Sequence, residues 1–319
     1  MLERTLCMES LSIAFNAVFP VFTLILLGAF FRHREILSEI TVKQLNRLLF
    51  IFLLPTLLFK NIYETEIGSV VNLKLFVFCF GGIAFFWFLT WVIVCFFIKD
   101  NRVRGAAIQG ISRGNFLLFS LSLIAALVPQ AYYSLASFLF AFSVSFVGLL
   151  AVITLEIFRG RKLHPLTMMK SIITNPVIIS CLLGVSALLI HLKLPNQIYS
   201  VINVVSGLAS PIGVIVMGAG LKIDKIKANK VVLSISVISK LIVIPFVAVV
   251  AAYLAGFKGT ELLIILILFA GPTSVSSYPM AAEMDSDEDL ACQIVVFTTA
   301  LASFSNFAFI SIIGMLGLF

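Results

Sequence analysis

Residues 269–285 read Phe-Ala-Gly-Pro-Thr-Ser-Val-Ser-Ser-Tyr-Pro-Met-Ala-Ala-Glu-Met-Asp and interrupt an apolar C-terminal region. A helix facing lipid does not tolerate two prolines, a glycine and several hydroxyls so close together, because freed backbone groups find no water in the hydrocarbon core. In transporters such interruptions form the substrate site, since they release amides and carbonyls from helical bonding. We therefore predict half of a binding site here, formed by Pro272, Thr273, Ser274, Ser276, Ser277 and Pro279.

The composition indicates an integral membrane protein. The chain has 319 residues, 61% hydrophobic and 12% charged, with a mean hydropathy of +1.14. Soluble domains are about 45–50% apolar and about 25% charged. The net charge of +7 comes mostly from loops between apolar runs, which is typical of membrane topology and not of a nucleic-acid-binding surface. The five cysteines and three histidines form no metal motif, so we expect no metal site, cofactor or nucleic-acid partner.

Ten apolar segments are long enough to cross a bilayer, which takes about 20 residues. Lys and Arg concentrate in the loops after the first, third, fifth and seventh segments, so the positive-inside rule puts both termini outside the plasma membrane. We predict an all-α membrane protein whose ten transmembrane helices cover residues 11–31, 45–63, 73–98, 105–128, 132–157, 166–190, 199–221, 231–255, 261–283 and 289–317.

The two halves of the chain repeat one another. Residues 20–28 and 176–184 share five of nine positions at an offset of 156 residues, and Pro55 maps onto Pro211 at the same offset. This divides the chain into two five-helix repeats, residues 1–160 and 161–319. Because five is odd, the second repeat enters the membrane in the opposite sense, which is the 5+5 inverted repeat of secondary transporters.

The same offset locates the second half of the site. Residues 113–122 map onto 269–278 and also contain Gly, Asn and Ser within an apolar span. We predict that spans four and nine are broken at equivalent depths and cross, presenting half-helix ends to one ligand. This adds to the substrate-binding set Arg113, Gly114, Asn115, Ser120 and Ser122.

Arg113 and Lys240 are the two cations that lie well inside predicted spans, away from the span ends, and no Asp or Glu lies at a span centre. A charge at mid-bilayer costs at least about 2.5–3.5 kcal/mol, so such residues face the bundle interior. The resulting positive interior suits an anionic substrate, which adds Lys240 to the site. Either cation could instead extend to the interface or bond freed carbonyls. Likewise, the Asn115 amide could bond a neighbouring helix, and the hydroxyls their own helix.

The acidic run 285–289 has two interpretations. Its clustered carboxylates resemble a metal-binding loop, but a helix start explains them better. In that interpretation Ser286 caps the tenth helix and Asp289 completes a capping box.

Five groups of residues together resemble the auxin efflux carrier family, including its bacterial malate and malonate permease-like members. They are 45–47 with 54–59, 113–116, 174–176, 209–211 with 218–221, and 271–274 with Glu283. The resemblance implies a fold similar to bile acid:sodium symporters, with helices 1, 2, 6 and 7 as scaffold and helices 3–5 and 8–10 as transport domain. It also implies elevator-like transport of organic anions by a homodimer. One departure is Ser122, where relatives usually have proline.

The sequence thus predicts a secondary active transporter of small organic anions, mono- or dicarboxylates, without catalytic residues. The alternatives are a membrane-embedded enzyme acting on lipid-linked substrates and an anion channel. An enzyme of that kind shows a nucleophile, metal ligands or paired carboxylates, whereas here capping explains the only acidic cluster and the sequence has no His/Cys/Asp constellation. A channel shows a charged ring or a repeated filter sequence, which this sequence lacks. The coupling ion, Na⁺ or H⁺, stays open.

Overall fold

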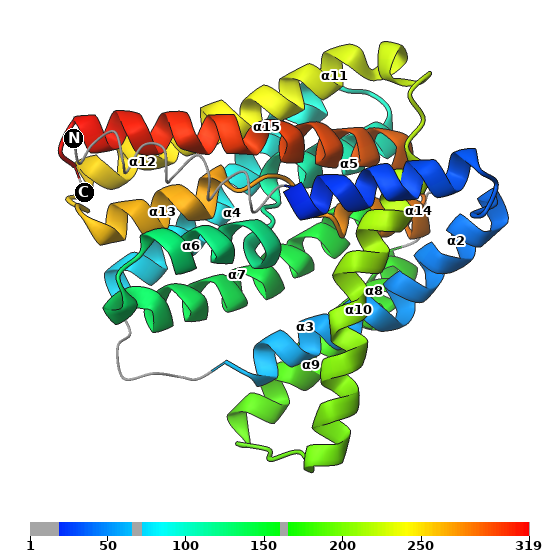
Figure 1. Ribbon diagram of the computed structural model, residues 1–319, viewed down its shortest axis with the longest axis horizontal. Helices are drawn as coiled ribbons and strands as arrows, with labels where there is room; N and C mark the ends of the chain where they lie inside the picture. The colour runs from blue at the N-terminus through cyan, green and yellow to red at the C-terminus, as the bar shows by residue number, and fades with distance from the viewer. Residues whose placement is uncertain (1–18, 66–71, 160–164, 319) are drawn as a thin grey trace.

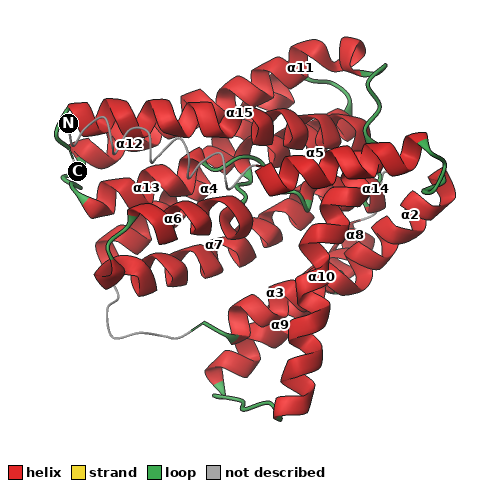
Figure 2. Ribbon diagram, viewed as in Figure 1, coloured by secondary structure: helices red, strands yellow, loops and turns green. Residues whose placement is uncertain are grey.

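The computed structural model describes residues 19–65, 72–159 and 165–318, so the predicted boundary between residues 160 and 161 and the start of the first span lie outside the described residues. Within these ranges the chain is helical, without strands (Figure 2). The first half contains the helix Phe19–His33, α2 (Glu39–Leu48), the π-helix η1 (Leu49–Leu53), α3 (Leu54–Tyr63), α4 (Leu73–Phe97), α5 (Asn101–Ser112), the π-helix η2 (Phe116–Ser120), α6 (Leu121–Leu127) and α7 (Gln130–Ile157).

The second half contains α8 (Pro165–Ile173), α9 (Pro176–Leu189), α10 (Asn196–Gly220), α11 (Ile226–Ile238), the π-helix η3 (Ser239–Val243), α12 (Ile244–Leu254), α13 (Thr260–Ala270), α14 (Ser277–Glu283) and α15 (Glu288–Met315). Among the described residues, 6 helices are long and apolar enough to cross a membrane, or 7 if α8 and α9, bent by 55°, form one span. The other predicted spans appear as shorter pieces, because the fourth and ninth are interrupted and the described part of the first begins at Phe19.

Prolines set the local shape of two long helices. Pro55 and Pro245 each occupy the second position of an α-helix that directly follows a π-helical turn, η1 and η3 respectively. Proline has no N–H to donate and its ring collides with the carbonyl four residues earlier, so the wider π turn relieves the clash without breaking the span.

The helices fall into two groups (Figure 1). Helices α4–α7 and α11–α15 lie together in one group, which we call the body, and most of the largest apolar cluster lies within it. The helix Phe19–His33 with α2, α3, α9 and α10 forms a second group, the arm, whose lower end extends beyond the body in Figure 1. A second apolar cluster joins the two groups, with Leu49 and Met217 from the arm and Val275, Tyr278 and Val295 from the body.

Two helix pairs in the arm approach closely through glycine. A β-carbon at Gly28 would lie 2.0 Å from the carbonyl oxygen of Ile215, and one at Gly218 would lie 2.1 Å from that of Ile25. Gly184 packs in the same way on α3, where its β-carbon would lie 2.9 Å from Cβ of Ile62. The two glycines of the repeated nine-residue stretch, Gly28 and Gly184, therefore each lie against a helix of the other half of the chain.

Gly218→Ala should destabilise the arm, because the added methyl group forces the helix Phe19–His33 away from α10. Overpacking of this kind costs about 1–3 kcal/mol. Gly207→Ala is the matched control in the same helix, since its β-carbon would have no heavy atom within 4 Å. In thermal unfolding of the detergent-purified protein, we expect a Tm several degrees lower for Gly218→Ala and an unchanged or higher Tm for Gly207→Ala. Equal values would contradict the close contact.

Candidate functional site: two crossing helix interruptions

The first interruption lies between α5 and η2. Helix α5 ends at Ser112, and its C-cap residue Arg113 is extended, with φ −90° and ψ 121°. Gly114 forms an antiparallel β-bridge with Thr273. A β-carbon at Gly114 would lie 2.5 Å from the Phe116 ring, which explains why a residue without a side chain is needed in this tight turn.

The second interruption runs antiparallel to the first. Helix α13 ends at Ala270, and α14 begins at Ser277. Between them, the Pro272 carbonyl accepts a hydrogen bond from the Asn115 N–H (2.7 Å). A β-carbon at Gly271 would lie 2.6 Å from the Ser120 hydroxyl oxygen, so this glycine also permits the close approach of the two segments. The predicted interruptions of spans four and nine are therefore present, and the two segments meet.

Side chains from neighbouring helices satisfy the carbonyls that the interruptions free. The Thr273 hydroxyl donates to the Gly110 carbonyl (2.6 Å), and the Ser120 hydroxyl donates to that of Ile267 (3.1 Å). Two side-chain amides also donate to backbone carbonyls here. The Gln109 amide donates to the Ser277 carbonyl (3.1 Å), and the Asn306 amide donates to the Ala270 carbonyl (3.0 Å). An unsatisfied buried backbone group costs about 1–3 kcal/mol, so these bonds hold the interruptions at membrane depth.

A cavity opens beside this crossing. It contains about 710 Å³ of space not filled by atoms, part of which is open to the outside, and it lies where both interruptions meet the arm. Its lining residues come from the crossing, η1, α3, α7, α9, α10 and α14; they are Leu49, Leu54, Leu57, Leu58, Arg113, Gly114, Asn115, Phe116, Val144, Val147, Val177, Ala209, Ser210, Gly213, Ser274, Val275, Ser276, Pro279 and Met280.

Arg113 is the notable polar group of the cavity. Its side chain is 3% exposed, and Nη1 donates to the Met280 thioether sulfur at 2.8 Å. Its Nε is buried without a hydrogen-bond partner, and none of the ion pairs in the described part of the chain involves it. A thioether is a weak acceptor for a guanidinium that can donate five hydrogen bonds. The cavity therefore contains an uncompensated positive charge.

The predicted site residues divide into three sets. The first set lines the cavity: Arg113, Gly114, Asn115, Ser274, Ser276 and Pro279. The second set forms the crossing itself: Ser120, Pro272, Thr273 and Ser277. The remaining two, Ser122 and Lys240, are not among the lining residues, since Ser122 is exposed on α6 and Lys240 is buried on η3.

Three contributors were not predicted as part of the site. Gln109 and Asn306 bond freed carbonyls, and the Thr298 hydroxyl accepts from the Thr273 N–H (3.1 Å). Each is a polar residue inside an apolar helix, which is the signal that could have identified it. Met280 was also missed, because a methionine in an apolar span resembles a packing residue.

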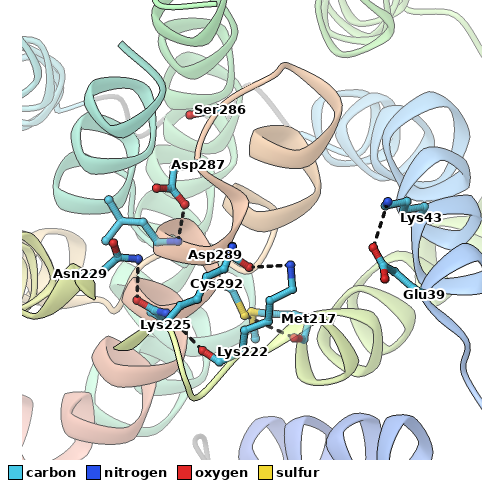
Figure 3. A network of polar contacts seen from close by, with 12 residues as sticks. Glu39, Lys43, Met217, Lys222, Lys225, Asn229, Ser286, Asp287, Asp289 and Cys292 are labelled. Atoms are coloured by element: carbon cyan, nitrogen blue, oxygen red, sulfur yellow. Dashed lines mark hydrogen bonds and ion pairs between the residues drawn. The ribbon is translucent and has the colours of Figure 1, made fainter. Parts of the chain in front are cut away.

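The acidic run at the start of α15 anchors neighbouring segments (Figure 3). The predicted cap Ser286 is wrong, because the N-cap is Asp287, whose carboxylate accepts from the Leu290 N–H (2.9 Å). Ser286 is buried and instead donates to the Arg102 carbonyl (2.8 Å). The described residues contain no group of three or more His, Cys, Asp or Glu that could hold a metal ion.

Asp289 pairs with two lysines of the loop between α10 and α11, Lys222 (3.2 Å) and Lys225 (2.6 Å), and not with the helix start as the predicted capping box requires. The hydrogen bond and charge of Asp289 raise the pKa of Lys225 above its ordinary value. These two ion pairs hold the start of α15 against the loop between α10 and α11, which connects the arm to the body.

Thr273→Val should weaken the crossing without changing side-chain volume. The buried Gly110 carbonyl loses its hydroxyl donor, which costs about 1–3 kcal/mol. Thr56→Val is the matched control, because the Thr56 hydroxyl bonds only the Phe52 carbonyl of its own helix. In thermal unfolding we expect a clear fall in Tm for Thr273→Val and little change for Thr56→Val. A Thr273→Val protein as stable as wild type would contradict the role of this bond.

Comparison with known proteins is consistent with this geometry. The family model described as membrane transport protein matches residues 13–166 and 161–310, which together span most of the chain. Comparison with curated proteins finds no match. Because the matched residues include both interruptions and the cavity, the chain belongs to the auxin efflux carrier family of membrane transport proteins.

Proposed function

We propose that this protein is a secondary active transporter of small organic anions and that Arg113 binds the anionic group of the substrate. The observation that carries the proposal is the Arg113 guanidinium, which is buried at the cavity, donates to the Met280 thioether and has an unpartnered Nε. Burying such a charge is costly unless a partner compensates it. A carboxylate that enters the cavity supplies the missing acceptors, with charge-assisted hydrogen bonds.

Asn115, Ser274 and Ser276 add neutral polar groups to the same cavity. The two serine hydroxyls lie 2.9 Å apart and bond each other. They can turn toward a bound oxygen without leaving the crossing, because both belong to the segment between α13 and α14. These residues orient the anion that Arg113 holds.

Transport follows an elevator-like alternating-access mechanism in which the body moves against the arm. The apolar cluster that joins the body to the arm supports this mechanism, since it is formed by side chains such as Leu49, Met217 and Tyr278. Because apolar contacts are non-directional, a movement of the body against the arm breaks no directional bond in this cluster. The packing of Gly28 and Gly184, each against a helix of the other half of the chain, supports a 5+5 inverted repeat of ten helices. The cation-rich loops favour a plasma-membrane protein with both termini outside, and the family resemblance implies a homodimer.

A transporter fits the cavity better than the alternative functions. A membrane-embedded enzyme acting on lipid-linked substrates needs an activated nucleophile, a metal or paired carboxylates, and the described cavity lining contains no His, Lys, Asp or Glu that could activate a serine and no Asp, Glu, His or Cys that could bind a metal. An anion channel needs a continuous polar path. Here the walls beyond the crossing are Leu and Val side chains.

Arg113→Gln should abolish substrate exchange in proteoliposomes. Hydrogen bonds to charged groups are worth about 1.5–3 kcal/mol, so we expect counterflow of labelled 2-oxohexanoate, or of labelled malate, to fall at least about tenfold. Arg34→Gln removes the same charge from an exposed loop and should exchange like wild type.

Two outcomes would contradict the proposal. One is wild-type exchange by Arg113→Gln. The other is the absence of counterflow in the wild-type protein, with downhill flux that unlabelled anion on the opposite side does not accelerate, as in a channel.

A further inference from the structure

Two cavities follow one another along the same helices of the arm. The cavity beside the crossing, the first cavity, is lined by residues within 49–58 of η1 and α3 and within 209–213 of α10. A second cavity contains about 500 Å³ of space not filled by atoms, part of which is open to the outside, and is lined by residues within 39–46 of α2 and by 219–221 at the end of α10. Because α2, η1 and α3 form one span, Glu39–Tyr63, the second cavity lies beyond the first toward the start of that span.

The lining of the second cavity is rich in charge, unlike that of the first. The cations Arg32, Lys43 and Lys222 outnumber the acids Glu39 and Glu288. Glu39 is moreover paired with Lys43 (3.1 Å), and Figure 3 shows this pair on one side and Lys222 on the other. An excess of positive charge in a cleft raises the local concentration of anions. We call the membrane face on which this cavity lies the cation-rich face.

Tyr278 lies between the two cavities. Its neighbours in sequence Ser276, Pro279 and Met280 line the first cavity, whereas Tyr278 lines the second. The side chain is 3% exposed and belongs to the apolar cluster that joins the body to the arm. Among the described residues of this cluster it is the one aromatic side chain, so it fills more of the junction than any of its neighbours.

The Tyr278 hydroxyl is in close contact with the arm. A β-carbon at Gly220 would lie 2.0 Å from Oη, and the Asn46 side chain on α2 approaches the same hydroxyl. Asn46 is 2% exposed, and its Oδ1 is buried without a hydrogen-bond partner. Tyr278 belongs to the body, and Gly220 and Asn46 belong to the arm, so a movement of the body against the arm separates them.

We propose that the two cavities are consecutive parts of one transport path and that the Tyr278 ring closes this path between them. The inference rests on the proposed function, because it gives the anion held at Arg113 a route to the cation-rich face. When the body moves, Tyr278 leaves Gly220 and Asn46, and the first cavity opens into the second. The Oδ1 atom of Asn46 is then an acceptor for the water that enters the junction.

Cysteine labelling across the barrier tests this inference. In a protein whose five native cysteines are replaced by alanine, Ser276→Cys lies in the first cavity and Lys43→Cys in the second. A membrane-impermeant thiosulfonate would be added to vesicles whose cation-rich face points outward, which labelling of Asp224→Cys in the exposed loop after α10 verifies. We expect Ser276→Cys to be labelled at least tenfold more slowly than Lys43→Cys.

Removal of the ring should open the path. Tyr278→Ala, combined with Ser276→Cys, should be labelled from the cation-rich face at least fivefold faster than Ser276→Cys alone. Tyr278→Leu should give an intermediate rate and serves if Tyr278→Ala is too unstable to purify. Tyr278→Phe keeps the ring and should be labelled like Ser276→Cys alone. Tyr253→Ala is the matched control, because it removes the same ring from an exposed position of α12.

The outcomes separate this inference from the proposed function. Unchanged labelling in folded Tyr278→Leu or Tyr278→Ala protein overturns the barrier, and so does equal acceleration by Tyr278→Phe or Tyr253→Ala. Fast labelling of Ser276→Cys while Tyr278 is present overturns it as well. None of these results alters the loss of counterflow expected for Arg113→Gln, which tests the anion site alone. Acceleration that is confined to Tyr278→Ala and Tyr278→Leu supports the barrier.

Discussion

The hydrogen bond from the Asn115 N–H to the Pro272 carbonyl, beside the Gly114–Thr273 bridge, is the contact on which the rest of the site depends. Two extended segments are stable inside a membrane protein only if their peptide groups find partners, since lipid offers none. The two interruptions bond each other and borrow donors from nearby helices, among them Gln109 and Asn306. Without this mutual pairing, backbone groups of each interruption would lack hydrogen-bond partners. With it, the two segments can lie side by side and line one part of the cavity.

The pairing also explains why Arg113 remains available. The freed carbonyls of Gly110, Ile267 and Ala270 already accept from Thr, Ser and Asn side chains, so they do not need the guanidinium. Arg113 is the C-cap of α5, and the extended backbone there places it among the cavity-lining residues and against Met280. A buried cation in this position is consistent with the proposal that an anionic ligand enters the cavity.

The sequence predicts much of this arrangement, and its errors have physical causes. The interruption at 271–276 is predicted because proline, glycine and hydroxyls are unsuited to a lipid-facing helix. The internal repeat then predicts the second interruption, which the structure has at 113–115. Lys240 was predicted to belong to the site because it is a cation inside a span. It is buried but is not among the residues that line the cavity, so a position inside a span does not by itself place a cation in the site. The donor Gln109 and the acceptor Thr298 were missed because bonds between segments distant in sequence leave no local pattern. Hydropathy alone does not separate Asp287 from Ser286 as the cap.

Protection of a cavity cysteine by substrate tests the central claim most directly. In a protein whose five native cysteines are replaced by alanine, Ser276→Cys would be labelled with a membrane-impermeant thiosulfonate, with and without 2-oxohexanoate. Gln197→Cys, exposed at the start of α10, is the control. We predict that 2-oxohexanoate slows labelling of Ser276→Cys at least threefold and leaves Gln197→Cys unaffected. An unchanged labelling rate at Ser276→Cys, in a protein that still exchanges 2-oxohexanoate, would contradict an anion site at the crossing.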